Sequence, residues 1–279
     1  MFTCLPGVCS SHCQRAADRR RGCARLLIRL NASLLALALL TGCPPPVVRV
    51  PVQPESVMRA NELAREADLA FARRDYYAAL IKYLEASRLN PNSQYVYNKL
   101  GIAYSQLKYY TEAGAAFQRS IALDRKFAYA YNNLGTVYFA TDDKGKAEKY
   151  FKKAIGLQES AASFHINLGT LYFEKGKFEK GMAELRKGLL LDPGVLGKGD
   201  GVNLAAFSSK PQSTEKSYSM ARVYASMGDV DRAVESLKQA LNNGFTNLDA
   251  IRREPDFDKI RQETKFVAFM REATLITKN

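Results

Sequence analysis

Apolar and small residues recur along residues 60–193 at spacings of three and four, with polar residues between them. Such spacing places the apolar side chains on one face of an α-helix. The pattern also repeats as a block every 34 residues, which predicts paired helices in four clear units over 57–193. The repeated block reads Tyr97-Asn-Lys-Leu100-Gly101-Ile-Ala-Tyr104, then Tyr131-Asn-Asn-Leu134-Gly135-Thr-Val-Tyr138, then His165-Ile-Asn-Leu168-Gly169-Thr-Leu-Tyr172.

Small residues stand where the two helices of a unit must approach each other closely. Gly101, Gly135 and Gly169 fall in the middle of predicted first helices, where glycine costs about 1 kcal/mol relative to alanine. That cost is tolerable where the helix backbone crosses its partner, and Ala67 holds the same place in the first unit. On the second helices we expect a small residue and a neighbouring larger one to complete each crossing: Ala79 with Tyr83, Ala113 with Phe117, Ala147 with Phe151, and Gly181 with Leu185.

The period of 34 and the Leu-Gly-x-x-Tyr run resemble the tetratricopeptide-repeat (TPR) family. The resemblance implies an all-α fold, a TPR α-solenoid in which helix–turn–helix pairs form a right-handed superhelix. A weaker fifth unit is expected over 214–243, after a Gly-, Ser- and Lys-rich insertion over 194–213 that we expect to be flexible. Apolar spacing in 244–279 predicts C-terminal helices that cap the open end of the core.

Residues 1–42 have the parts of a bacterial secretory leader. Six arginines within 15–29 precede an apolar run, Leu30 to Leu40, that is too short to span a membrane comfortably. Leu40-Thr-Gly-Cys43 resembles the lipobox of bacterial lipoproteins, in which the leader is cleaved before a cysteine that receives lipid. The alternative is an ordinary signal peptide with a chance cysteine. We therefore expect a lipoprotein signal peptide over 1–42 and a lipid anchor such as palmitate at Cys43.

Five prolines follow within 43–56 and predict an extended Pro-rich tether over this range. The residue after Cys43 is Pro44 rather than aspartate. By resemblance to enteric lipoproteins, this predicts a location in the cell envelope, at the outer membrane facing the periplasm.

Composition argues against several kinds of site. All five cysteines lie within residues 4–43, so cleavage before Cys43 would leave one, too few for a disulfide or a cysteine-based metal site. The chain has only two histidines, and His165 takes the place of Tyr97 and Tyr131, where we expect a packed imidazole. We expect no metal, no cofactor, no small-molecule substrate and no enzyme activity, because no nucleophile and base are paired in the sequence.

The formal net charge is +13, of which the first 43 residues, with six arginines and one aspartate, carry +5. Lysines crowd the second helix of the third unit, and we favour a solvated outer face over contact with anionic lipid head groups. No nucleic-acid partner is expected. These lysines are Lys144, Lys146, Lys149, Lys152 and Lys153.

In TPR proteins the first helix of each pair lines a groove that binds partner segments. The resemblance carries this role to a set of aromatic, amide and hydroxyl side chains with few charges, which suit a peptide. For each of them the alternative is packing against neighbouring helices. The predicted groove residues are Phe71, Tyr95, Asn98, Ile102, Tyr129, Asn132, Thr136, Phe139, Ile166, Thr170 and Phe173.

These features together predict a membrane-anchored TPR scaffold that binds protein or peptide segments of envelope proteins. By analogy of architecture, pilus or outer-membrane assembly is the expected process. The alternative is an accessory module that recruits cell-wall or polysaccharide-export enzymes.

Overall fold

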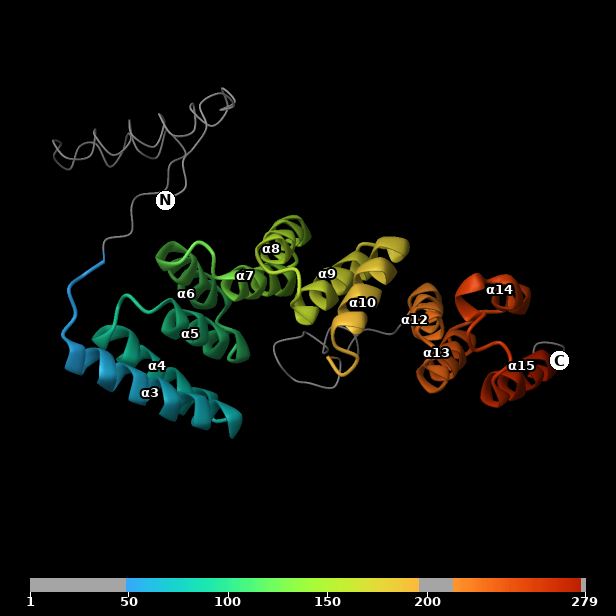
Figure 1. The fold of residues 1–279 in the computed structure, drawn as a ribbon, viewed down its shortest axis with the longest axis horizontal. Coiled ribbons are helices and arrows are strands. Elements are labelled where there is room, and N and C mark those ends of the chain that lie inside the picture. The colour runs from blue at the N-terminus through green and yellow to red at the C-terminus, as the bar shows by residue number, and fades with distance from the viewer. Residues whose placement is uncertain (1–48, 196–212, 277–279) are drawn as a thin grey trace, which may run out of the picture. The chain divides into compact units, whose positions relative to one another are not determined.

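The computed structural model describes residues 49–195 and 213–276, and within these ranges all regular structure is helical. The leader, Cys43 and most of the insertion lie outside the described residues. The elements in Figure 1 are α3 (Pro54–Ala72), α4 (Tyr76–Leu89), α5 (Gln94–Gln106), α6 (Tyr110–Leu123), α7 (Ala128–Ala140), α8 (Lys144–Leu157), α9 (Ala162–Glu174), α10 (Phe178–Leu191), α12 (Thr214–Met227), α13 (Val230–Asn242), α14 (Leu248–Arg253), η2 (Pro255–Phe257) and α15 (Thr264–Ile276).

The helices pack in consecutive pairs. Each first helix packs along the second helix of its own unit, as α5 does on α6, and each second helix contacts the next unit. First helices of neighbouring units also touch, α5 against α7 and α7 against α9. The all-α fold of stacked helix pairs predicted from the sequence is therefore confirmed.

The turn inside each of the first four units has the same backbone conformation. Arg74, Lys108, Asp142 and Gly176 have φ angles of 64°, 64°, 62° and 66° and are spaced 34 residues apart. This left-handed conformation costs a residue other than glycine about 1–2 kcal/mol. The repeat is therefore visible in the backbone as well as in the side chains.

The predicted close crossings are present. A Cβ atom added to Gly101 would lie 2.6 Å from the Phe117 ring, and one added to Gly135 would lie 2.7 Å from the Phe151 ring. At Gly169 the added atom would lie 3.1 Å from the backbone oxygen of Gly181. Glycine is therefore needed because the neighbouring helix occupies the space of a side chain.

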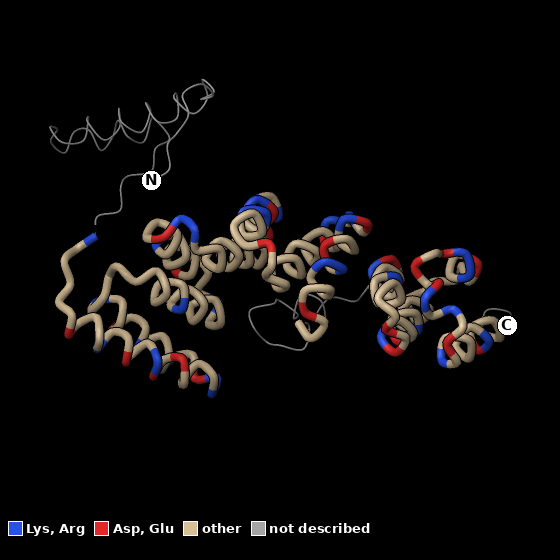
Figure 2. Tube along the Cα trace, in the orientation of Figure 1, with Lys and Arg blue, Asp and Glu red and all other residues tan. Residues whose placement is uncertain are grey.

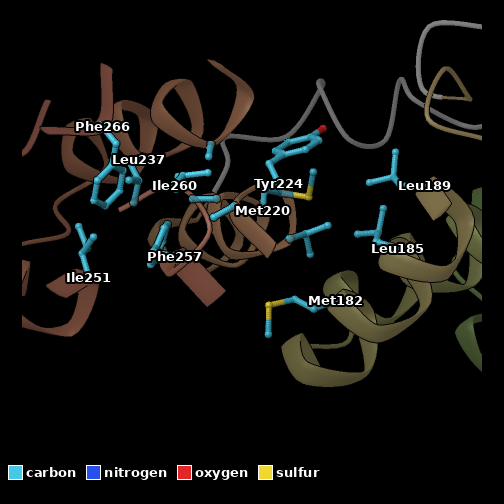
Figure 3. Close-up of a cluster of buried hydrophobic side chains, with 14 of the residues drawn as sticks. Met182, Leu185, Leu189, Met220, Tyr224, Leu237, Ile251, Phe257, Ile260 and Phe266 are labelled. Carbon is cyan, nitrogen blue, oxygen red and sulfur yellow. The ribbon is translucent and has the colours of Figure 1, made fainter. Parts of the chain in front are cut away.

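The buried apolar residues form clusters of two kinds. In the first four units each cluster joins only two neighbouring units, as where Phe117 of α6 meets Leu134 of α7. A larger cluster runs from α9 and α10 through α12 and α13 to α15, and it includes Phe257 and Ile260. Figure 3 shows Met220 and Tyr224 of α12 lying between the leucines of α10 on one side and Leu237 and Phe257 on the other. The C-terminal helices thus share one core with the fifth unit.

The chain enters the first unit differently from the prediction. Helix α3 begins at Pro54, three residues before the predicted start, because proline fits the first position of a helix and Glu55 follows it in the first turn. The backbone of Val50 exchanges two hydrogen bonds with the Asn92 amide, at 3.2 and 2.7 Å. A guanidinium nitrogen of Arg49 donates to the backbone oxygen of Leu123 at 3.2 Å. Residues 49 and 50 are therefore held against the ends of the first and second units.

Candidate partner-binding site

The predicted groove residues lie on α3, α5, α7 and α9, and they differ in exposure. Tyr95 and Tyr129 are 42% and 45% exposed, and four more are partly buried. The other five, Asn98, Asn132, Ile166, Thr170 and Phe173, are buried. The accessible residues form what we call the first-helix surface: Phe71, Tyr95, Ile102, Tyr129, Thr136 and Phe139.

Asparagines link the first helices of the second, third and fourth units. The amide nitrogen of Asn133 donates to the amide oxygen of Asn98 at 3.0 Å, and that of Asn167 donates to Asn132 at 2.9 Å. Asn132 in turn donates to Asn133 at 3.3 Å, which joins the two bonds into one chain. Asn98 and Asn132 thus bond to neighbouring helices, which explains their burial and fixes the spacing of α5, α7 and α9.

The first helix of the fourth unit is buried more deeply than those before it. Ile166 fills the notch at Gly188, where an added Cβ would lie 2.7 Å from the Ile166 Cδ1 atom. Phe173 packs against Gly181 and against the ring of Phe178. The Thr170 hydroxyl donates to the backbone oxygen of Ile166 at 2.9 Å. These three side chains support the core, so they offer little surface to a partner.

Asp68 of α3 is the centre of a polar cluster at the edge of the first-helix surface. It accepts hydrogen bonds from the hydroxyls of Tyr83 at 2.5 Å and Tyr95 at 2.8 Å, and Lys99 pairs with it at 3.0 Å. Burial raises the pKa of the Asp68 carboxyl, but the hydrogen bonds from Tyr83, Lys99 and Tyr95 outweigh burial and hold this pKa below its ordinary value. The Tyr95 hydroxyl is thus fixed by the first unit, and its ring is left partly open.

Sequence reasoning overlooked Lys99 in this cluster. Lys99 occupies the position that Asn133 and Asn167 hold in the next two units, 34 and 68 residues later. It binds Asp68 of the preceding unit where the asparagines bind an amide. An aligned comparison of the units would have marked this position as a link between first helices.

Tyr129 is positioned by two other rings. Its ring centre lies 5.3 Å from that of Phe164 in an edge-to-face arrangement and 6.0 Å from that of Phe127. Such aromatic pairs hold a ring in place at little cost in conformational freedom. Tyr95 and Tyr129 therefore stand at matching positions of neighbouring units, each held by its surroundings.

His165 is 2% exposed, and its two ring nitrogens lie 2.7 Å from the Glu184 carboxylate and 2.9 Å from the backbone oxygen of Glu159. The imidazole is packed between these groups, as expected from its place in the repeat. The described residues contain no group of three His, Cys, Asp or Glu side chains that could hold a metal ion.

Lysines gather on α8, as the blue segments in Figure 2 show. Glu148 of α8 binds Lys152 at 2.7 Å and Lys175 of the fourth unit at 2.6 Å. These hydrogen bonds lower the pKa of the Glu148 carboxyl to about 2. Lys149 and Lys153 are exposed, and no acid in the described part of the chain pairs with them. Lys144 and Lys146 pair with Asp142 and Asp143, so within the described residues three of the five lysines on α8 are in ion pairs and two are not.

Family comparison agrees with this architecture. Three profiles described as tetratricopeptide repeat match residues 93–160, 132–194 and 218–248. The chain contains tetratricopeptide repeats over these residues. The third match falls on α12 and α13, so the weak fifth unit predicted from the sequence is a TPR as well.

Solved structures resemble this chain at low sequence identity. PilF of Pseudomonas aeruginosa is 13% identical, with a TM-score of 0.51 over 80% of this chain and 92% of PilF. A thermophilic TPR protein of Thermus thermophilus is 18% identical, with a TM-score of 0.48 over 77% of this chain and 99% of that protein. The first TPR of Spaghetti, solved with a peptide of HSP90, is 20% identical, with a TM-score of 0.42 over 45% and 97%.

In the described ranges, 49–195 and 213–276, no helix combines the length and the apolar character that crossing a membrane requires.

Proposed function

We propose that this TPR protein is a lipid-anchored scaffold that binds a segment of another envelope protein along its first-helix surface. The observation that carries the proposal is the pair of exposed rings, Tyr95 and Tyr129, at matching positions of neighbouring units. Large aromatic residues held in place supply contact area at low entropic cost, and they are enriched among residues that dominate binding energy.

The surroundings of these rings favour a peptide over a charged ligand. Ile102, Thr136 and Phe139 are partly exposed beside them and carry no charge. At this edge of the described structure Lys99 is paired with Asp68, so neither group is a free charge for a ligand. An extended or helical segment with apolar side chains fits such a surface best.

The membrane anchor is the second part of the proposal. Six arginines, a short leucine-rich run and Leu40-Thr-Gly-Cys43 support cleavage before Cys43 and attachment of lipid to that residue. Anchoring at the outer membrane on the periplasmic side would place the scaffold among envelope proteins, and assembly of a pilus or of the outer membrane is the process we propose.

The partner surface can be tested by crosslinking in the native organism, followed by recovery of the tagged protein. The triple change Tyr95→Ala, Tyr129→Ala and Phe139→Ala should reduce recovery of a specific partner at least tenfold. The matched control is Tyr77→Ala with Tyr109→Ala, because these tyrosines are 61% and 44% exposed but lie outside the first-helix surface. Equal recovery with both variants would refute the proposed surface.

The anchor can be tested separately by mass spectrometry of the mature N-terminus. We expect a lipid-modified Cys43 as the first residue, and we expect Cys43→Ser to move the protein from the membrane to the soluble fraction. An unmodified N-terminus at another residue would rule out the anchor and leave the partner surface untouched.

The process is the remaining question. Loss of pili or of assembled outer-membrane proteins on deletion of the gene is the expected result. Normal pili and outer membrane, together with co-purification of cell-wall hydrolases or polysaccharide-export enzymes, would instead assign the scaffold to enzyme recruitment.

A further inference from the structure

The C-terminal end of the repeats contains a cavity that the first-helix surface does not include. It has a volume of about 600 Å³ and lies between α14, the turn after η2, and α15. Its apolar wall comes from α15, chiefly Val267, Met270 and Leu275, and Leu275 is 69% exposed. The cavity is largely open to solvent rather than enclosed, which suits contact with a partner surface better than burial of a small ligand.

Helix α15 packs one face into the fold and leaves the edge of that face partly open, with Met270 half-buried against the core and Leu275 exposed. Phe266, Phe269 and Ala273 belong to the large C-terminal core. Val267, Met270 and Leu275 lie on the cavity side with Arg271 and Thr274. The five positions are related by steps of three, four, seven and eight residues, which form one continuous stripe on a helix. Such a stripe is the pattern by which one helix receives another.

The charged residues that line this cavity are all basic. Residues 248–276 contain six basic and six acidic residues, yet the cavity is lined by three arginines and no acid. Two of the arginines are fixed: Arg252 bonds to Asp249 and to the Thr274 hydroxyl, and Arg261 bonds to Asp258. Arg271 is exposed, and no acid in residues 49–195 or 213–276 pairs with it. The unpaired Arg271 therefore borders an apolar stripe that is partly exposed, most fully at Leu275.

The N-terminal end of the repeats is covered by charged rather than apolar side chains. Glu62 and Glu66 of α3 occupy the positions of Val96 and Leu100 in the second unit, where those apolar residues are buried. Glu62 pairs with Arg59, and Glu66 pairs with Lys82 at 2.5 Å. The first helix thus closes the repeats with paired charges, whereas the last helix presents apolar side chains and an unpaired arginine.

We propose that this end is a second docking site, for an amphipathic helix of a partner protein that carries acidic residues beside its apolar face. The partner's apolar residues pack on Val267, Met270 and Leu275, and its carboxylate pairs with Arg271. Glu62, Glu66 and Asp68 of α3 are already paired within the chain, so these carboxylates are not available to Arg271 of a second copy, and we assign the charge complement to a different protein.

The site can be tested with the full chain in nanodiscs of neutral lipid, using empty nanodiscs as the blank. The probe is a labelled 18-residue helical peptide with leucines on one face and glutamates flanking them, and its partner peptide has lysines in place of the glutamates. Fluorescence polarisation should show saturable binding of the glutamate peptide and at least tenfold weaker binding of the lysine peptide.

Variants locate the binding. Arg271→Glu should weaken binding of the glutamate peptide at least tenfold, and Leu275→Gln about fivefold. Arg253→Glu is the matched control, because Arg253 is exposed on α14 but does not line the cavity. Changes at Tyr95 and Tyr129 should have no effect, so failure here and failure of the first-helix surface are distinguishable.

Three results would overturn the proposal. The first is equal binding of the two peptides, and the second is unchanged binding to Arg271→Glu and Leu275→Gln. The third is a dimer in sedimentation that dissociates on Leu275→Gln, because that would assign the site to a second copy of the chain. Circular dichroism on each variant separates loss of binding from loss of the fold.

Discussion

The first four repeats and the C-terminal region are stabilised in different ways. In the repeats each apolar cluster joins two neighbouring units and ends there. In the C-terminal region a single cluster includes residues from α9 to α15. Four units with nearest-neighbour contacts should unfold in parts, as solenoids do, whereas the C-terminal region should unfold as one body.

An ion network strengthens this contrast. Arg186 of α10 and Arg222 of α12 both bind Asp256 of η2, at 3.1 and 3.0 Å, and Arg222 also binds Glu254 and Glu179. These bonds connect the fourth unit, the fifth unit and the C-terminal cap. The insertion between the fourth and fifth units therefore does not divide the packing, because side chains on both sides of it converge on η2.

The largest expected effect on stability comes from removing one buried aromatic ring from each of the two regions. Phe117→Ala and Phe257→Ala should each cost about 3–5 kcal/mol, because both rings are almost fully buried. Hydrogen exchange should lose protection only in α5 to α7 for Phe117→Ala, but throughout α10 to α15 for Phe257→Ala. Equal spread of the effect in both variants would remove the distinction between the regions.

The helix crossings test whether the units differ among themselves. Gly135→Ala should cost about 1–3 kcal/mol because the new Cβ meets the Phe151 ring. Adding Phe151→Leu should recover much of this cost. Gly169→Ala meets backbone atoms of Gly181 and Leu185 at 3.1 Å as well as the Leu185 Cγ at 3.0 Å, so shortening Leu185 to alanine should recover little of its cost. Urea unfolding of the single and double variants checks this, and rescue at both crossings would contradict the structure.

Acid titration tests the ion pairs between the third and fourth units. The pKa of Glu148 falls from 4.5 to about 2 in the folded chain because Lys152 and Lys175 hydrogen bond to it. The unfolded chain takes up the proton first, so this stabilisation is complete above about pH 5 and is lost as the pH falls towards 2. Glu148→Gln should remove about 1–2 kcal/mol of pH dependence from unfolding curves. Glu85→Gln, at an exposed site of α4, is the control and should leave the curve unchanged.

The smallest expected effect is a gain in stability at a turn. Lys108 has a φ of 64°, so Lys108→Gly should stabilise the second unit by about 0.5–1 kcal/mol, because glycine adopts this conformation without strain. The equivalent turn of the fourth unit already has Gly176, and Gly176→Lys should cost a similar amount. Thermal unfolding measures both changes, and a loss on Lys108→Gly would show that the lysine side chain has a role of its own.

The repeat architecture followed from the sequence because its causes are local and periodic. Spacing of 34, mid-helix glycines and the large residues opposite them are visible in a single chain, and Gly135 with Phe151 confirms the expected contact. The sequence did not predict which side chains of the first helices are exposed. Asn98 can bond a peptide or a neighbouring helix with the same amide, and only the position of Asn133 decides between them.

The fourth unit shows the same limit more clearly. Ile166 matches Asn132 by period, but it is buried in the core cluster that extends into α12. Whether the side chains of a first helix are exposed depends on the elements that pack beyond its own unit. Here those elements follow a long insertion, so the period of 34 does not predict them. The start of α3 was missed because prolines in a tether and a proline that opens a helix look alike in sequence.

The hydrogen bonds of Arg49 and Val50 set how far the protein can reach. Six peptide steps separate Cys43 from Arg49, and a fully extended chain covers at most about 3.6 Å per step. With lipid on Cys43, the point where the chain is clamped to Leu123 and Asn92 could then rise no more than about 20 Å above the bilayer. The first repeats would then lie close to the membrane surface, within reach of proteins that are near the lipid.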